Sequence, residues 1–106
     1  MKKPIVALIY DFDGTLAPGN MQEFGFIQAV GSTPQEFWSM SNQIAVGQDA
    51  SNVLSYMKLM YDEAKVKGIH LRQKDFKTFG KSVEFFPGVE QWFKLVNDYG
   101  KSRGIK

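Results

Sequence analysis

The first apolar feature of the chain is the continuous run Ile5-Val6-Ala7-Leu8-Ile9-Tyr10, which lies between Pro4 and the polar Asp11. An unbroken run rich in β-branched residues is typical of a strand that is buried on both faces. Such strands belong to parallel sheets, and open α/β sheets bind ligands at the carboxyl edge of their strands. The pattern therefore predicts a buried strand over residues 5–10 that ends at a ligand-binding edge.

Beyond residue 16 the apolar positions change to helical spacing, which predicts a series of helices. Asn20 to Glu23 and Thr33 to Glu36 each have the form of a capping box, and Gly68 is suited to end a helix. In the third helix an apolar stripe is expected to pack against the rest of the protein. The first two expected helices span residues 20–30 and 34–46, the third contains residues 53–64 and stops at Gly68, and the fourth spans residues 73–82. A last helix begins after Pro87-Gly88. The stripe consists of Val53, Leu54, Met57, Met60, Tyr61 and Ala64.

The predicted elements leave the strand at residues 5–10 without a partner strand among the 106 residues. An unpaired apolar strand is an aggregation hazard, because its backbone edges and apolar faces remain open. We therefore expect either self-association of the chain or pairing with a further portion of a sheet core.

Composition places the chain among ordinary globular domains, with 43% hydrophobic and 23% charged residues. The absence of cysteine excludes disulfides and thiolate metal sites, and it agrees with a cytoplasmic location. A net charge of +2, with basic residues interleaved among acids, gives no basis for nucleic-acid binding. No apolar run approaches the roughly 20 residues that span a bilayer, so no membrane partner is expected.

Candidate chemistry lies in Asp11-Phe12-Asp13-Gly14-Thr15, directly after the predicted strand. One carboxylate can attack phosphorus to form an aspartyl-phosphate, and a second can donate and remove the protons that the two steps require. Gly14 permits a turn whose backbone N–H groups could face a phosphate. Carboxylate oxygens also suit Mg²⁺, which takes one or two protein carboxylates together with waters and phosphate oxygens.

Two other interpretations of this segment are weaker. A calcium loop of the EF-hand type requires glycine at its sixth position, whereas Gly14 is the fourth residue counted from Asp11. Alternatively, the two aspartates only cap a turn.

The segment Tyr10-Asp11-Phe12-Asp13-Gly14-Thr15-Leu16 resembles the first signature of the haloacid dehalogenase superfamily, in its phosphatase branch. The resemblance implies that Asp11 is the nucleophile and a Mg²⁺ ligand. It implies that Asp13 is the general acid/base and also a metal ligand, through its backbone carbonyl. Phe12, Gly14 and Thr15 would form the phosphate-binding turn.

The resemblance also implies an α/β fold, in which a Rossmann-like parallel-sheet core carries an inserted α-helical cap. Residues 1–16 would be the first core strand and catalytic loop, 17–86 the cap, and 87–106 the helix that returns to the core at Phe86-Pro87-Gly88-Val89. The family's later motifs, a strand ending in Ser or Thr, a Lys or Arg, and an acidic pair, have no counterpart. We therefore expect an N-terminal fragment with negligible phosphatase activity alone.

The expected function is magnesium-dependent hydrolysis of a small phosphorylated metabolite, with Gln22, Glu23 and Lys58 of the cap as candidate substrate contacts. Two alternatives stay open. One is a helical binding module without catalysis, and the other is a phosphomutase or phosphonate hydrolase of the same superfamily.

Overall fold

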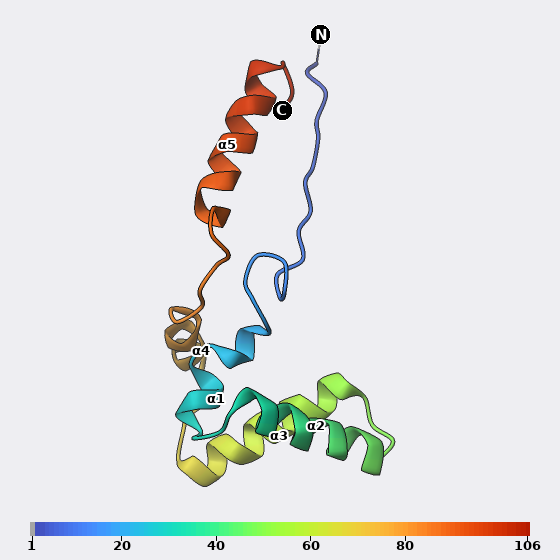
Figure 1. Ribbon diagram of the computed structural model, residues 1–106, viewed down its shortest axis with the longest axis vertical. Helices are drawn as coiled ribbons and strands as arrows, with labels where there is room; N and C mark the ends of the chain where they lie inside the picture. Colours follow the sequence, from blue (N-terminus) through green and yellow to red (C-terminus); the bar gives the residue numbers. More distant parts are fainter. Residues whose placement is uncertain (1) are drawn as a thin grey trace. The chain divides into compact units, whose positions relative to one another are not determined.

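The computed structural model describes residues 2–106, which are mostly helical and contain no strand (Figure 1). They divide into two units, one formed by Met21–Val83 and the other by the residues up to Asn20 together with Glu84–Lys106. No helix in these residues is long and apolar enough to cross a membrane. In chain order the helices are the 3-10 turn η1 (Met21–Glu23), α1 (Phe26–Ala29), α2 (Pro34–Gly47), α3 (Asn52–Lys67), α4 (Gln73–Gly80) and α5 (Val89–Ser102).

The unit of residues 21–83 has a hydrophobic core built from α1, α2 and α3. The ring of Phe26 meets the rings of Phe37 and Phe79 edge to face, with centroid distances of 6.3 and 5.8 Å. This geometry is favourable for aromatic pairs, because the positive edge of one ring faces the negative face of the other. The buried residues of the core are Phe26, Ile27, Val30, Phe37, Leu59 and Ala64.

Helices α2 and α3 begin and end close to the predicted positions. The Thr33 hydroxyl accepts the Glu36 N–H at 3.2 Å, and the Glu36 carboxylate accepts the Thr33 N–H at 3.1 Å. This reciprocal capping box confirms the predicted start of α2. Gly68 ends α3 with φ at +68°, in the left-handed conformation that glycine adopts without steric cost. Helix α4 also lies within its predicted range.

The single helix predicted over residues 20–30 is wrong, because Gly25 divides it into η1 and α1. Gly25 has φ at +94°, which an α-helix cannot accommodate. Its N–H donates to the side-chain oxygen of Gln28 at 2.9 Å, so the backbone restarts a helix at this point. A Cβ at Gly25 would lie 3.3 Å from the backbone of Phe79, which also explains why glycine occupies the position.

The apolar stripe predicted for α3 is mostly exposed rather than packed. Val53, Leu54, Met57 and Tyr61 are each more than half exposed. Two of its predicted members are packed, since Ala64 is buried in the core and Met60 packs against it. The buried face of the helix contains Ser55, Leu59 and Ala64, so it overlaps the predicted stripe only in part. Ser55 can be buried because its hydroxyl donates to the Ser51 carbonyl at 2.8 Å.

In the other unit, residues 5–10 are extended alongside α5, but they form no strand (Figure 1). The predicted burial on both faces is also wrong, since Ile5 is 77% and Ile9 is 93% exposed. A strand needs a partner for its ladder of hydrogen bonds, and residues 2–106 provide none over this length. The side of the segment that carries Tyr10 does meet α5. The Tyr10 and Phe93 rings lie 5.7 Å apart, and the Trp92 indole donates to the Tyr10 hydroxyl at 2.6 Å.

One backbone contact shows how α5 returns the chain to this segment. The Lys106 N–H donates to the Pro4 carbonyl at 2.9 Å, and the Val6 N–H donates to the Lys106 carbonyl at 3.0 Å. Hydrogen bonds from one residue to two residues that flank a single position on the neighbouring segment are the pattern of parallel strands. The parallel sense expected for residues 5–10 is therefore present over one residue, although the sheet is not.

Candidate functional site

The candidate site is a tight loop that begins at the end of the extended apolar segment. The Phe12 carbonyl accepts three backbone N–H groups, from Thr15 at 3.1 Å, Leu16 at 2.9 Å and Ala17 at 3.2 Å. The Gly14 N–H donates to the Ala17 carbonyl at 2.7 Å. These bonds fold residues 12–17 into a closed turn.

Gly14 is required by the backbone of this turn rather than by lack of space. Its φ is +75°, and an added Cβ would have no atom within 4 Å. A residue with a side chain would be strained there, because only glycine enters this region without a steric penalty. The sequence prediction that Gly14 permits the turn agrees with this geometry.

Residues directly before α5 contact the loop and bury part of it. Ala17 is 1% exposed, and the Leu16 carbonyl accepts the Phe86 N–H at 2.9 Å. The Phe12 ring meets the Phe85 ring edge to face at 6.1 Å. From the sequence, Phe86 was expected only in the segment that returns to the core, and neither Phe85 nor Phe86 was linked to the loop. Their position directly before Pro87-Gly88 was the available signal.

Both candidate catalytic carboxylates lie on this loop and are exposed. Asp11 precedes the turn and Asp13 lies within it, two residues apart in the chain. The N–H groups of Gly14 and Thr15, which were expected to face a phosphate, instead donate to carbonyls of the loop itself. Any phosphate at this loop must therefore be bound by other groups, or the turn must open to receive it.

The loop offers few side chains that could bind a metal ion. Residues 2–106 contain no group of three or more His, Cys, Asp or Glu side chains that could together hold a metal ion. Two carboxylates are nevertheless within the number that Mg²⁺ takes from a protein, because this ion keeps several waters and binds phosphate oxygens directly. The oxygen donors of Asp11 and Asp13 thus fit Mg²⁺ in kind, and the remaining ligands would have to come from water and substrate.

The three candidate substrate contacts belong to the other unit, and their surroundings differ. The Glu23 carboxylate accepts the Trp38 indole N–H at 2.8 Å, which ties η1 to α2. The side-chain oxygen of Gln22 is buried and has no hydrogen-bond partner within residues 2–106. Lys58 pairs with Asp62 one turn along α3, and both side chains are about half exposed.

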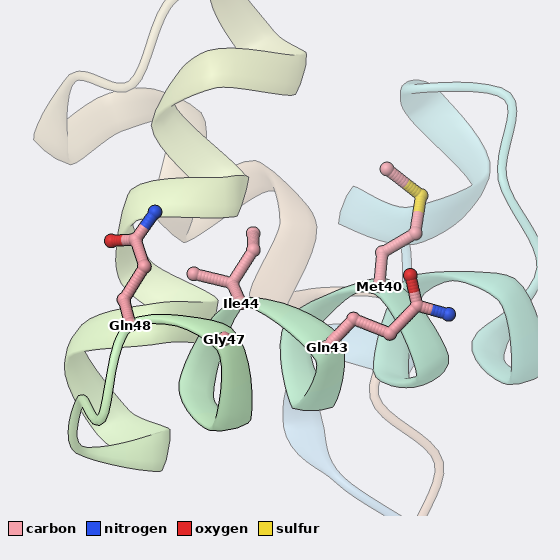
Figure 2. Close-up of a pocket in the computed structure, with 5 residues that line it drawn as sticks. All are labelled: Met40, Gln43, Ile44, Gly47 and Gln48. Atoms are coloured by element: carbon pink, nitrogen blue, oxygen red, sulfur yellow. The ribbon is translucent and has the colours of Figure 1, made fainter.

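Hollows elsewhere on the molecule offer less chemistry. One hollow, of about 410 Å³, lies at the end of α2. Figure 2 shows the residues that line it, which are Met40, Gln43, Ile44, Gly47 and Gln48. None of these residues titrates, so the hollow provides no acid, base or nucleophile. A larger groove of about 860 Å³ lies between the extended segment and α5, with a mainly apolar lining that includes Val6, Leu8 and Phe93.

The site therefore consists of the closed Phe12–Ala17 turn with two exposed carboxylates at its start. Asp11 and Asp13 lie two residues apart in this part of the chain. Comparison with protein-family models, with curated proteins and with solved structures finds no match for this chain.

Proposed function

We propose that this chain carries the nucleophile loop of a magnesium-dependent phosphohydrolase that acts through an aspartyl-phosphate intermediate. The observation that supports this most directly is the closed Phe12–Ala17 turn, which presents two exposed carboxylates at the end of an extended apolar segment. The substrate class is a small phosphorylated metabolite with a phosphomonoester group. The absence of cysteine is in keeping with our expectation of a cytoplasmic enzyme.

In the first step a carboxylate oxygen of Asp11 attacks the phosphorus atom and displaces the ester oxygen. The protonated Asp13 carboxyl donates its proton to that leaving oxygen, which departs as an alcohol. In the second step a water attacks the phosphorus of the aspartyl-phosphate, while the Asp13 carboxylate takes a proton from this water. The bond between phosphorus and Asp11 then breaks, inorganic phosphate leaves, and both side chains return to their starting states.

Mg²⁺, held by the Asp11 carboxylate and the Asp13 backbone carbonyl, would supply neutralisation of charge on the phosphoryl oxygens. The chain's own residues provide the nucleophile and the acid/base. Exposure of both aspartates leaves the charges of the reaction in water, where electrostatic stabilisation is weak. We therefore expect negligible turnover by the 106-residue chain alone.

The fold proposal, a Rossmann-like core with an inserted helical cap, is supported by two features. Lys106 pairs in the parallel sense with residues 4–6, as a strand following α5 would in a βαβ arrangement. Residues 21–83 form a separate helical unit, which begins soon after the loop and ends just before Glu84. An insertion at this point would leave the loop and the return helix as parts of one core.

A second candidate, a helical binding module without catalysis, is favoured by one observation. The unit of residues 21–83 has a hydrophobic core that includes no residue of the Asp11 loop. It also presents the exposed apolar residues Val53, Leu54, Met57 and Tyr61 along α3. Such a module would be indifferent to the chemistry of Asp11. A phosphomutase or phosphonate hydrolase would share the loop and differ only in the handling of the substrate.

Capture of beryllofluoride, an analogue of the phosphoryl group, separates these candidates. We expect ¹⁹F NMR to show a bound, Mg²⁺-dependent signal with the wild-type chain and none with Asp11→Asn. Asp49→Asn is the matched control, because it makes the same change at an exposed aspartate with φ at +48°, a conformation that asparagine tolerates. A bound signal that persists in Asp11→Asn, or no signal with the wild type, would count against the proposed function.

A further inference from the structure

The extended segment has one backbone edge that makes no hydrogen bond within residues 2–106. Successive residues of an extended strand direct their N–H and C=O groups to opposite edges. Pro4 and Val6 bond to Lys106, so the even-numbered residues face the edge where α5 returns. The odd-numbered residues face the other edge, and these are Lys3, Ile5, Ala7, Ile9 and Asp11.

This open edge is well suited to accept another strand. Pro4, the one residue here without an N–H, belongs to the opposite edge, so all five odd-numbered residues keep both a donor and an acceptor. Ile5 and Ile9 are 77% and 93% exposed on the face that α5 does not cover. An unpaired apolar edge of this length is a template for pairing with another chain.

The charges at the two ends of the segment indicate which chain fits. Lys3 lies at its start and Asp11 at its end, four residues on either side of Ala7. If two copies pair in parallel, lysine lies opposite lysine and aspartate opposite aspartate, and like charges directly opposite are destabilising. If two copies pair antiparallel about Ala7, each Lys3 lies opposite the Asp11 of its partner. The segment is thus complementary to itself in the antiparallel sense.

We propose that a second copy of this chain pairs with residues 3–11 along the open edge, antiparallel, with the two Ala7 residues on a two-fold axis. In this register odd residues oppose odd residues, so Lys3 pairs with Asp11, Ile5 with Ile9 and Ala7 with itself. These are the residues whose backbone groups face the partner, so each pair exchanges both hydrogen bonds. The dimer does not depend on the proposed phosphohydrolase activity.

Disulfide trapping tests the register, because the chain has no cysteine of its own. Opposed residues have Cα atoms about 5.5 Å apart, which is within the range that a disulfide spans. We expect Ala7→Cys to cross-link with itself, and an equimolar mixture of Ile5→Cys and Ile9→Cys to form the mixed dimer. Ile5→Cys alone is the control: its two copies would lie about 14 Å apart along the strands and should not cross-link.

Charge variants test the pairing without cross-linking. Sedimentation equilibrium of the wild-type chain should show a concentration-dependent rise from the monomer mass of 12.0 kDa to twice that value. Lys3→Asp should raise the dimer dissociation constant about tenfold, because two attractive pairs become repulsive. Lys2→Asp makes the same change at a residue that opposes Phe12, so its effect should stay below about twofold. The charge exchange Lys3→Asp with Asp11→Lys should restore dimerisation.

Three results would overturn the proposal. A chain that remains monomeric at every concentration has no such interface. Self-cross-linking of Ile5→Cys as efficient as that of Ala7→Cys would indicate a parallel pair or unspecific aggregation. Equal weakening by Lys2→Asp and Lys3→Asp would show that overall charge, rather than the Lys3–Asp11 pair, controls association.

Discussion

The two units of the molecule contain similar helices, yet only one of them has a core. Helix α3 of the 21–83 unit has 16 residues and α5 of the other unit has 14. Among residues 2–106, every buried hydrophobic residue except Ala17 lies in the 21–83 unit. Along α5, by contrast, Trp92 is 45%, Leu95 64% and Tyr99 62% exposed.

The difference shows that forming a helix and burying it are separate requirements. Helix formation depends on caps, spacing and glycine positions, which are local. Burial depends on a partner surface, which α5 meets at Tyr10 of the extended segment. The region that carries the candidate chemistry is thus the less buried of the two, and the following predictions test that contrast.

The largest difference between the two units is expected in the loss of stability when a phenylalanine is replaced by alanine. Phe37→Ala removes a ring that is 1% exposed and should lower the free energy of unfolding of the 21–83 unit by about 3–5 kcal/mol. Phe93→Ala removes a ring that is 39% exposed and should cost about 1 kcal/mol, mainly its contact with Tyr10. Urea unfolding followed by circular dichroism measures both. Similar losses of unfolding free energy in the two variants would contradict the contrast between the buried and the exposed unit.

Alanine substitution at two glycines with positive φ should cause the same backbone strain but change different properties of the two units. Gly68 at the end of α3 has φ at +68°, Gly88 at the start of α5 has φ at +90°, and a Cβ at either would meet no atom within 4 Å. Replacement by alanine should cost about 1 kcal/mol of backbone strain in both places. Gly68→Ala should lower the melting temperature of the 21–83 unit, whereas Gly88→Ala should only reduce protection of the first α5 amides from hydrogen exchange. A melting shift from Gly88→Ala would mean that the two units unfold together.

The smallest expected effect is a pH-dependent change in melting temperature caused by the ion pair at the start of α4. The hydrogen bond from the Arg72 guanidinium lowers the pKa of the Asp75 carboxyl below its ordinary value of 3.8. A lowered folded-state pKa stabilises the protein above the unfolded pKa, and this contribution is lost as the pH falls through the folded value. Asp75→Asn should therefore lower the melting temperature slightly near neutral pH and have no effect in strong acid. An equal shift at both pH values would exclude the ion pair as its cause.

The sequence predicted local features well, as the ends of α2 and α3 show. Thr33, Glu36 and Gly68 act within a few residues of their own positions, so their roles could be inferred without the fold. The turn at Gly14 was predicted for the same reason. Gly25 was overlooked because a glycine inside a helical pattern is often tolerated, and its positive φ becomes apparent only with Gln28 and Phe79 in place.

Features that depend on partners could not be predicted in the same way. Two overlapping faces of α3 were available for burial, and the packed one contains Ser55, whose polarity argued against it. Periodicity does not show which face meets the neighbouring helix. The extended segment has the composition of a buried strand, but the structure places no strand beside residues 5–10. The hydrogen bond between the Phe86 N–H and the Leu16 carbonyl joins residues far apart in the sequence, so no local pattern predicts it.

The most direct test of the account is to map where a phosphoryl group attaches. The chain would be incubated with Mg²⁺ and a small phosphodonor such as acetyl phosphate, and its acid-stabilised peptides analysed by mass spectrometry. We predict Mg²⁺-dependent label on Asp11 alone, well below one group per chain, retained in Asp49→Asn and lost in Asp11→Asn. Label spread equally over exposed carboxylates, or unchanged in Asp11→Asn, would contradict the assignment of Asp11 as the nucleophile.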